Sequence, residues 1–336
     1  MKYSARKYTF LLIFLLPAAS LYPDQLNLNF TVGQNYGEYI EETGQKTPSN
    51  LQGLSGGSRI TYPRDFKTWG IGLDWFYNKF EILTSLNTTA GKVVTGEGRD
   101  EDFFLDPIIS TARGSKISLM DGEFYDTAYT FTGLRNYADA KGTMRLQEFG
   151  ARFKGRYYFN ESPQENGGFF VSIGYNYTYS YYLFENIVQY VDLPSTGKQL
   201  YAIPGRALTL TVNSHEYLFG AGYRFQKEKW FMEFSFMPLL STTEARDRHN
   251  LRFMNFFIQS YGSGLLFSTK YSQEIIETIF MAVEIFEHRN YQKGVVQARG
   301  GVTREDLFAN YVGSGRIYMN NKESGFLLSV TKRFNY

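Results

Sequence analysis

The feature that most constrains the fold is an alternation of apolar and polar side chains with a period of two, which recurs along the chain. Successive side chains of a β-strand point to opposite faces, so each alternating segment predicts a strand with one apolar and one polar face. The alternation is clearest at residues 148–159 and 171–181. The first has Phe149, Ala151, Phe153, Tyr157 and Phe159 on one face, and Glu148, Arg152, Lys154 and Arg156 on the other.

The composition indicates which kind of sheet this is. Aromatic residues make up 18% of the chain, with 27 Tyr and 30 Phe, yet the mean hydropathy is only −0.34 and cysteine is absent. Aromatic girdles, a lipid-facing apolar band and a polar lumen explain this combination in a membrane β-barrel, whereas no stretch after residue 20 is apolar and long enough for a membrane helix. The sequence therefore predicts an all-β, transmembrane antiparallel β-barrel.

Ten strands are expected, which is an even number as in single-chain bacterial barrels. They start near Leu26, Thr68, Phe80, Thr143, Phe169, Leu208, Trp230, Phe253, Ile279 and Ser324. Short connections, such as 160–168 and 226–229, are expected on the periplasmic side. Long extracellular connections are expected near 40–66, 96–142, 185–207, 243–252 and 289–322. Inward charges such as Arg156 and Arg224 are expected to fill a narrow lumen, which disfavours a wide pore.

The first twenty residues are typical of an export signal. Lys2, Arg6 and Lys7 precede an apolar run at residues 8–16, and small residues follow at 17–20. We expect residues 1–20 to be a cleaved signal peptide and residues 21–336 to be one barrel domain in the bacterial outer membrane, in contact with its lipid; an uncleaved anchor is the alternative. The net charge of +2 includes no basic block, so nucleic acid is not an expected partner.

Two pairs of side chains carry candidate chemistry. Asp247 and His249 are two residues apart and share a face in extended chain. A carboxylate beside an imidazole orients the ring and raises its pKa, as a general base requires. Asp100 and Asp102 have the same spacing, and two close carboxyls can share a proton or hold a water molecule. Taken alone, Asp247 and His249 favour a solvated rim without a role, and Asp100 and Asp102 are also compatible with a solvated rim or a Ca²⁺ site.

Taken together, the pairs resemble the omptin family of ten-strand outer-membrane aspartyl-type proteases. In that family an Asp-x-Asp pair follows the third strand and an Asp-x-His pair follows the seventh. Asp100-Glu101-Asp102-Phe103 and Asp247-Arg248-His249 are similar in order and spacing, as are the segments 54–56, 73–75 and 222–225. The resemblance implies that Asp100, Asp102, Asp247 and His249 are catalytic and activate a water molecule against a peptide or protein substrate at the cell surface.

The sequence also departs from the family pattern. Omptins that cleave between basic residues carry acids where this chain has Ser58 and Ala245, so the resemblance does not imply a preference for Arg or Lys. The segment 175–179 lacks the acid and base with which omptins bind lipopolysaccharide. We therefore expect no cofactor, and activation by lipopolysaccharide is the alternative. The alternative function is a non-enzymatic barrel, an adhesin or a small porin, with solvated or Ca²⁺-binding rim acids.

Overall fold

The computed structural model describes residues 23–45, 56–104, 136–193, 197–302 and 314–335. The strands are β1 (Gln25–Gln45), β2 (Gly56–Pro63), β3 (Phe66–Tyr77), β4 (Phe80–Thr88), β5 (Val93–Phe104), β6 (Asn136–Tyr158), β7 (Gly167–Leu193), β8 (Gly197–Lys227), β9 (Trp230–His249), β10 (Met254–Ile276), β11 (Ile279–Gly300) and β12 (Ser314–Asn335). One short helix, α3 (Pro163–Asn166), precedes β7. No helix in these ranges has the length and hydropathy needed to cross a bilayer. The expected signal peptide, residues 1–20, lies outside the described residues.

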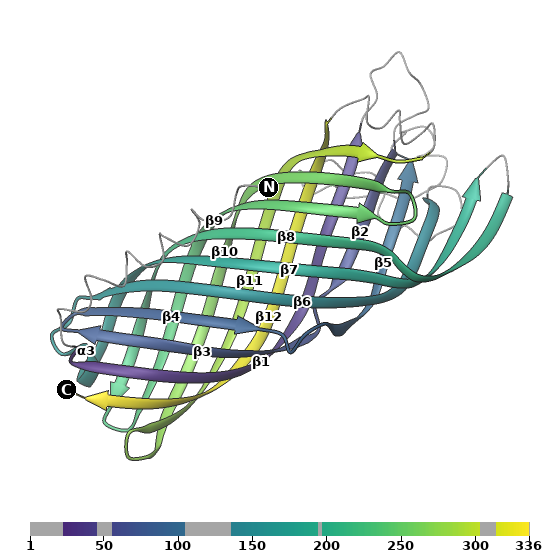
Figure 1. Cartoon of the computed structure of the whole chain (residues 1–336). Helices are drawn as coiled ribbons and strands as arrows, with labels where there is room; N and C mark the ends of the chain where they lie inside the picture. Colours follow the sequence, from purple (N-terminus) through teal and green to yellow (C-terminus); the bar gives the residue numbers. More distant parts are fainter. Residues whose placement is uncertain (1–22, 46–55, 105–135, 194–196, 303–313, 336) are drawn as a thin grey trace, which may run out of the picture.

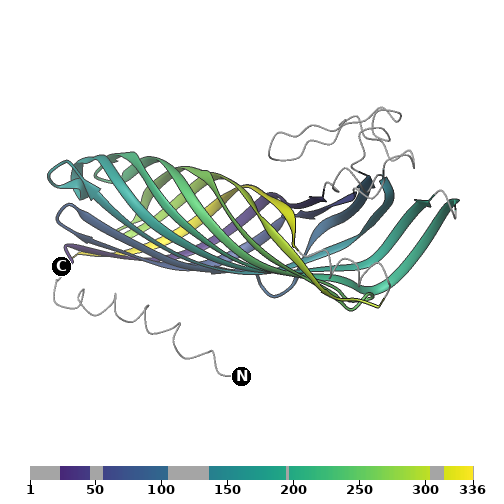
Figure 2. The same cartoon turned by 90° about the horizontal axis from the view of Figure 1, so that it is seen from above.

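The strands form one antiparallel sheet that closes on itself, because β1 pairs with β12 along almost its whole length (Figures 1 and 2). The other side of β1 pairs with β3 in its lower part and with β2 in its upper part. In the same way, β6 pairs with both β4 and β5. The pieces β2 and β3 therefore share one position in the barrel wall, and β4 and β5 share the next. Within the described ranges, twelve strands occupy ten positions of the wall. The expected barrel is confirmed, while β2 and β5 are two strands more than the ten that the sequence predicts.

Tight turns join the strands at the end opposite the candidate site. Tyr77 pairs with Phe80, and Lys227 with Trp230, so only two residues separate the strands in each case. Asn78, the first residue of the turn between β3 and β4, has a φ of 53°, which lies in the left-handed region. These are the short turns that the sequence predicts on the periplasmic side.

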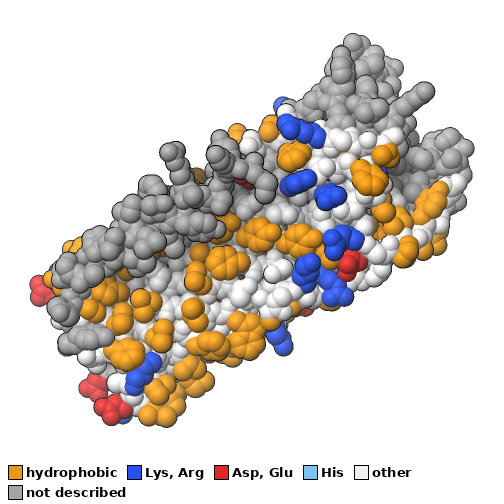
Figure 3. Space-filling view, in the orientation of Figure 1, with side chains coloured by type: hydrophobic (Ala, Val, Ile, Leu, Met, Phe, Trp, Pro, Cys, Tyr) orange, Lys and Arg blue, Asp and Glu red, His pale blue; other side chains and the backbone are white. Residues whose placement is uncertain are grey.

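The outer wall of the lower barrel is apolar (Figure 3). On every strand position of this part, alternate aromatic or aliphatic side chains point outward and are exposed. They include Leu28, Phe30, Ile71, Leu73, Phe153, Ile173, Phe219, Phe236, Phe267, Ile285 and Leu328. Such a band is what lipid contact requires. On β9 it ends at Leu240, so Asp247 lies seven residues further on, or about 20 Å along the strand.

The bounds expected for the long extracellular connections are wrong. Their described parts are mostly strand: β9 continues to His249, β8 begins at Gly197, β11 continues to Gly300 and β12 begins at Ser314 rather than Ser324. Above the apolar band the outward face of β9 is polar, with Thr242, Glu244, Arg246 and Arg248, so hydropathy no longer alternates even though side-chain direction does. Hydropathy alone therefore predicts a loop for strand segments that extend above the bilayer.

The lumen is filled by side chains, as the inward charges predict. Near the periplasmic end, Arg156 and Arg224 lie between Glu81 and Glu233, with N–O distances of 2.6 to 3.0 Å, and all four are buried. Further up, inward residues form an apolar core that includes Met144, Leu146, Tyr182, Phe184, Leu210, Ala245, Ile258 and Met319. Breaking a buried ion pair typically costs about 3–5 kcal/mol, so these layers hold the wall together across the lumen.

Candidate active site

Asp247 and His249 are the last inward-facing residues of β9. Burial alternates strictly along β9, and the odd-numbered residues from 233 onward point into the lumen. The Nε2 atom of His249 lies 2.9 Å from Oδ2 of Asp247, and the Asp247 residue is only 3% exposed. The His249 ring also packs against Phe256 of β10, with 4.9 Å between ring centroids. The extended-chain spacing therefore predicted this pair correctly, although it lies on a strand rather than in a loop.

Asp100 and Asp102 point inward from β5. They pair in register with Ile60 and Ser58 of β2, which are inward positions too. The Ser58 hydroxyl donates a hydrogen bond to Oδ1 of Asp100 over 3.2 Å. Ser58, one of the two places where an omptin-like acid was sought, therefore holds a candidate catalytic carboxyl in position.

The two pairs meet across the lumen, because β5 belongs to the third strand position and β9 to the seventh. Burial and the negative charge of Asp102 raise the pKa of Asp100 to about 8, against the opposing effect of His249. Burial also raises the pKa of Asp102, again opposed by His249. The four residues singled out from the sequence thus form one electrostatically coupled group outside the apolar band.

Burial and the neighbouring groups change the pKa of His249 in opposite directions. Burial alone would lower its pKa, but the charge and hydrogen bond of Asp247, with a further contribution from Asp100, raise it to about 9. The Oδ1 atom of Asp247 is buried without a hydrogen-bond partner. A carboxylate in this position stabilises the imidazolium that forms when the ring takes up a proton.

Glu41 is a site residue that the sequence analysis missed. It points inward near the upper end of β1 and is 4% exposed, and Oε1 accepts a hydrogen bond from the Tyr39 hydroxyl over 3.2 Å. Burial raises its pKa, and the charge of Asp247 raises it further. The inward alternation of β1, continued from Gln25 to residue 41, indicates it, but the sequence predicts a connection at residues 40–66.

A layer of tyrosine rings lies beneath Glu41. Tyr39 stacks on Tyr182 at 5.9 Å, and Tyr62 packs against Tyr182 at 4.9 Å. The Tyr182 hydroxyl accepts a hydrogen bond from Arg64, which also binds Glu148. This floor separates the mouth from the lumen below it.

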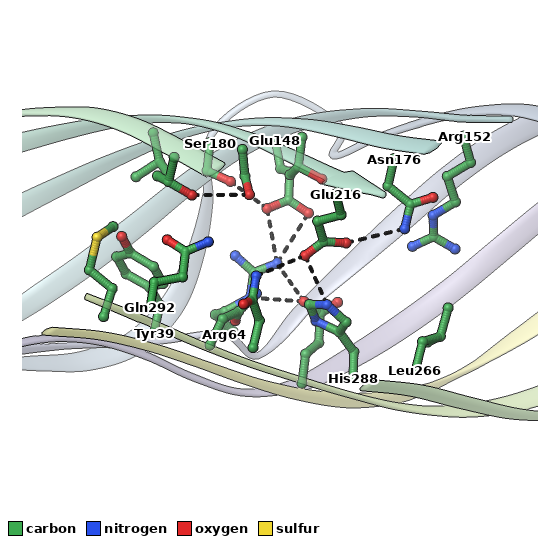
Figure 4. A pocket seen from close by; sticks show the side chains of 18 of the residues that line it. Tyr39, Arg64, Glu148, Arg152, Asn176, Ser180, Glu216, Leu266, His288 and Gln292 are labelled. Carbon is green, nitrogen blue, oxygen red and sulfur yellow. Dashed lines mark hydrogen bonds and ion pairs between the residues drawn. The ribbon is translucent and has the colours of Figure 1, made fainter. Parts of the chain in front are cut away.

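Below the floor lies a polar cavity of about 70 Å³ (Figure 4). Arg64 contacts Glu148 at 2.9 Å and Glu323 at 2.7 Å, and Glu216 lies 2.9 Å from His288. Figure 4 shows Glu148 and Glu216 reaching from one side of the lumen toward Arg64 and His288 on the other. His288 is therefore part of the lumen filling and is remote from the candidate catalytic group.

The third histidine, His215, lies on another part of the wall. His215 points outward, and its Nδ1 atom lies 2.7 Å from the Tyr175 hydroxyl. Among the residues that the structure describes, no three histidine or acidic side chains are grouped as a metal site requires. The Ca²⁺ site considered for the rim acids therefore has no ligand set in that part of the chain.

Comparisons with known proteins concern the fold and the family. Residues 47–328 match the model of a protein family described as "Putative porin". The fold is similar to that of the outer membrane protease OmpT from Escherichia coli, with a TM-score of 0.65 and 12% identity over 93% of this chain and 97% of that chain. The translocator domain of the autotransporter NalP from Neisseria meningitidis matches with a TM-score of 0.35 and 11% identity, over 97% of this chain and 96% of that one.

OprG from Pseudomonas aeruginosa matches with a TM-score of 0.37 and 6% identity, over 94% of this chain and 97% of that chain. No curated protein matches the sequence. At 12% identity, the likeness to OmpT concerns the fold alone. Family and fold together identify a β-barrel of the bacterial outer membrane.

Proposed function

The chain belongs to this porin family, and we propose that it is an endopeptidase that hydrolyses peptide bonds at its extracellular mouth. The observation that carries the proposal is the electrostatically coupled group of Asp100, Asp102, Asp247 and His249, in which Asp247 is buried and the other three are partly exposed. Perturbed titratable groups that converge in a concave site are typical of catalysis. The order of the two pairs along the chain, which is similar to that in omptins, supports the same conclusion.

In the proposed reaction, a water molecule lies between His249 and the carboxyl pair. Nε2 of His249 faces Asp247, so Nδ1 takes the proton of the water as its oxygen attacks the peptide carbonyl. The proton shared by Asp100 and Asp102 is donated as a hydrogen bond to the developing oxyanion. The tetrahedral intermediate then collapses, and the leaving amine receives its proton from His249. No covalent intermediate with the protein forms.

The carboxyls at the mouth favour a cationic substrate. Burial raises the pKa of Glu41, and the charge of Asp247 raises it further. An Arg or Lys side chain beside the scissile bond would favour the ionised form of Glu41 and pair with it. Glu41 supplies the acid that Ser58 and Ala245 do not, so we propose a preference for basic residues.

A diffusion porin is the second candidate, which the family description favours. The buried ion pairs in the lumen support the protease instead. A solute would have to displace Arg64 from Glu148 and, lower down, Arg156 from Glu81, and both contacts measure 2.9 Å. Each displacement exposes an uncompensated buried charge.

The test uses refolded protein, with and without lipopolysaccharide, incubated with a mixed peptide library. We expect cleavage by the wild type, enriched at Arg or Lys, and at least a thousandfold loss in His249→Ala and Asp100→Ala, as about 4 kcal/mol of transition-state stabilisation implies. Arg248→Ala is the matched control, because its side chain points outward one residue from His249. Equal cleavage by wild type and His249→Ala would refute the proposal.

A further inference from the structure

The strand β8 rises above its neighbour β9 and leaves an edge without a strand beside it. Pairing between β8 and β9 ends at Leu208 and His249. Pairing between β7 and β8 continues to Leu193 and Gly197. Residues 197–206 of β8 therefore have a strand partner on one side only, within the part of the chain that the structure describes. The long β7–β8 hairpin (teal) projects past the other strands in Figures 1 and 2.

This edge begins immediately above the candidate catalytic pair. The carbonyl of Ala207 accepts a hydrogen bond from the Asn250 backbone N–H over 2.9 Å, and Leu208 lies opposite His249. A strand added to the free edge would continue the line that β9 follows up to His249. Its lower end would arrive at the barrel mouth, beside the proposed reacting water.

The side chains of the edge provide surfaces for a partner. Ile203 packs on the apolar core of the mouth, and Tyr201 shares its face, two residues further up. Tyr201 is 46% exposed, and Leu200, on the opposite face, is 69% exposed. Apolar side chains on both faces of a hairpin that stands in water are a feature of interaction surfaces.

A local irregularity sets the lower limit of the edge. Gly205 has a φ of 79°, and its backbone N–H donates to Oδ1 of Asn186 over 2.9 Å. Pro204 has no N–H to donate. Regular ladder groups are therefore available at residues 198–203, where backbone N–H and C=O alternate between the two sides of the strand.

We propose that the β8 edge at residues 198–203 binds the peptide substrate as an added β-strand, which delivers the scissile bond to His249. This proposal rests on the proposed endopeptidase function. Backbone hydrogen bonds to the edge would hold an extended peptide of almost any sequence, while the acidic mouth selects the residue beside the scissile bond. The occupant is an extended, unfolded peptide segment, because a folded substrate has no free backbone to pair.

Binding is tested with the full-length His249→Ala protein and fluorescein-labelled twelve-residue peptides with a central Arg-Arg, each N-methylated at one backbone nitrogen. Anisotropy should show affinity reduced about three- to tenfold at alternate positions on one side of Arg-Arg, and unchanged at the positions between, as expected for single lost hydrogen bonds. Equal effects at neighbouring positions, or no binding of the unmodified peptide, would overturn the proposal.

A matched pair of variants tests the protein side. The N–H groups of Leu200 and Tyr201 point to opposite sides of β8, so only one of Leu200→Pro and Tyr201→Pro removes a donor from the free edge. We expect that one variant weakens peptide binding three- to tenfold in this way, with the hairpin intact by hydrogen exchange. If both variants bind like the parent while the hairpin stays folded, the edge is not the binding site.

Cleavage by the wild type, measured in parallel, separates the two proposals. Cleavage without the alternating pattern of binding would overturn edge binding and support the endopeptidase proposal. Alternating binding without cleavage would support edge binding and refute the endopeptidase proposal. A dimer in light scattering that the edge-facing proline variant dissociates would assign the edge to a second copy and overturn substrate binding there.

Discussion

At the scale of single residues, the candidate site depends on two groups whose proton affinities have been brought close together. Burial and Asp102 raise the pKa of Asp100 to about 8, and Asp247 raises that of His249 to about 9 against the effect of burial. The proposed reaction needs the carboxyl protonated and the imidazole neutral. The titration of Asp100 and His249 should therefore be measurable in the pH dependence of activity and of stability.

The first prediction concerns activity. Below its pKa of about 9, His249 is mostly protonated and cannot accept a proton from water, and above its pKa of about 8, Asp100 is mostly ionised. The productive form, with Asp100 protonated and His249 neutral, is therefore a minor state whose population is largest between about pH 8 and pH 9 and falls on both sides. We expect a bell-shaped profile of kcat/KM with its maximum between these values, measured with a fluorogenic peptide, and the two limits belong to the coupled group rather than to single residues. A rate that is constant from pH 5 to pH 10 would contradict these roles.

The second prediction concerns stability. The folded-state pKa of Asp100, about 8, lies above its usual value of 3.8, so its contribution is fully present below about pH 4 and is lost as pH rises to about 8. Asn cannot ionise and avoids this loss. Asp100→Asn should therefore stabilise the barrel at pH 9 by on the order of 2 kcal/mol and leave it nearly unchanged at pH 4. Unfolding in detergent at both pH values measures this, and stabilisation at pH 4 alone would refute it.

At the scale of elements, the break between β2 and β3 inserts one arginine into the lumen. Arg64 lies between Pro63 and the start of β3, and its backbone N–H donates to the Gly37 carbonyl of β1. Its guanidinium reaches Glu148 of β6, Tyr182 of β7 and Glu323 of β12. A single side chain therefore ties four positions of the wall together directly below the candidate site.

The third prediction follows from this arrangement. Arg64→Ala leaves the buried carboxylate of Glu148 and the mostly buried one of Glu323 without their cation, so it should destabilise the barrel by about 3–5 kcal/mol. Arg145→Ala is the matched control, because its ion pair with Glu185 lies half-exposed on the outer wall and should contribute less than about 1 kcal/mol. Urea unfolding in detergent micelles gives both values. Equal losses would show that the lumen network does not stabilise the wall.

The strands also show which parts of the fold the sequence could predict. The segments 148–159 and 171–181 alternate between lipid and lumen, so hydropathy alone predicted β6 and β7. The stretch 241–249 of β9 is mostly polar on both faces, so its sequence predicts a loop, and only the spacing of Asp247 and His249 indicates that the two share a face. Glu41 was missed for the same reason. The proximity of β5 and β9 across the lumen depends on barrel closure. No local sequence pattern predicts it, and only the resemblance to omptins implied it.

At the scale of the whole molecule, the barrel combines a sealed lower part with an acidic mouth that rises above the lipid band. Two layers of buried ion pairs cross the lumen, and the candidate catalytic group lies above both. Membership of a porin family and the proposed protease function therefore make opposite predictions for one preparation. A conducting barrel requires open layers, whereas the endopeptidase requires only an accessible mouth.

The most direct test measures both activities on the same proteoliposomes: single-channel conductance, and cleavage of a fluorogenic peptide containing Arg-Arg. We expect cleavage that His249→Ala abolishes and Arg248→Ala retains, with no stable conductance from the folded barrel. Steady conductance together with an intact peptide, from protein whose folding is verified, would contradict the endopeptidase and favour the porin.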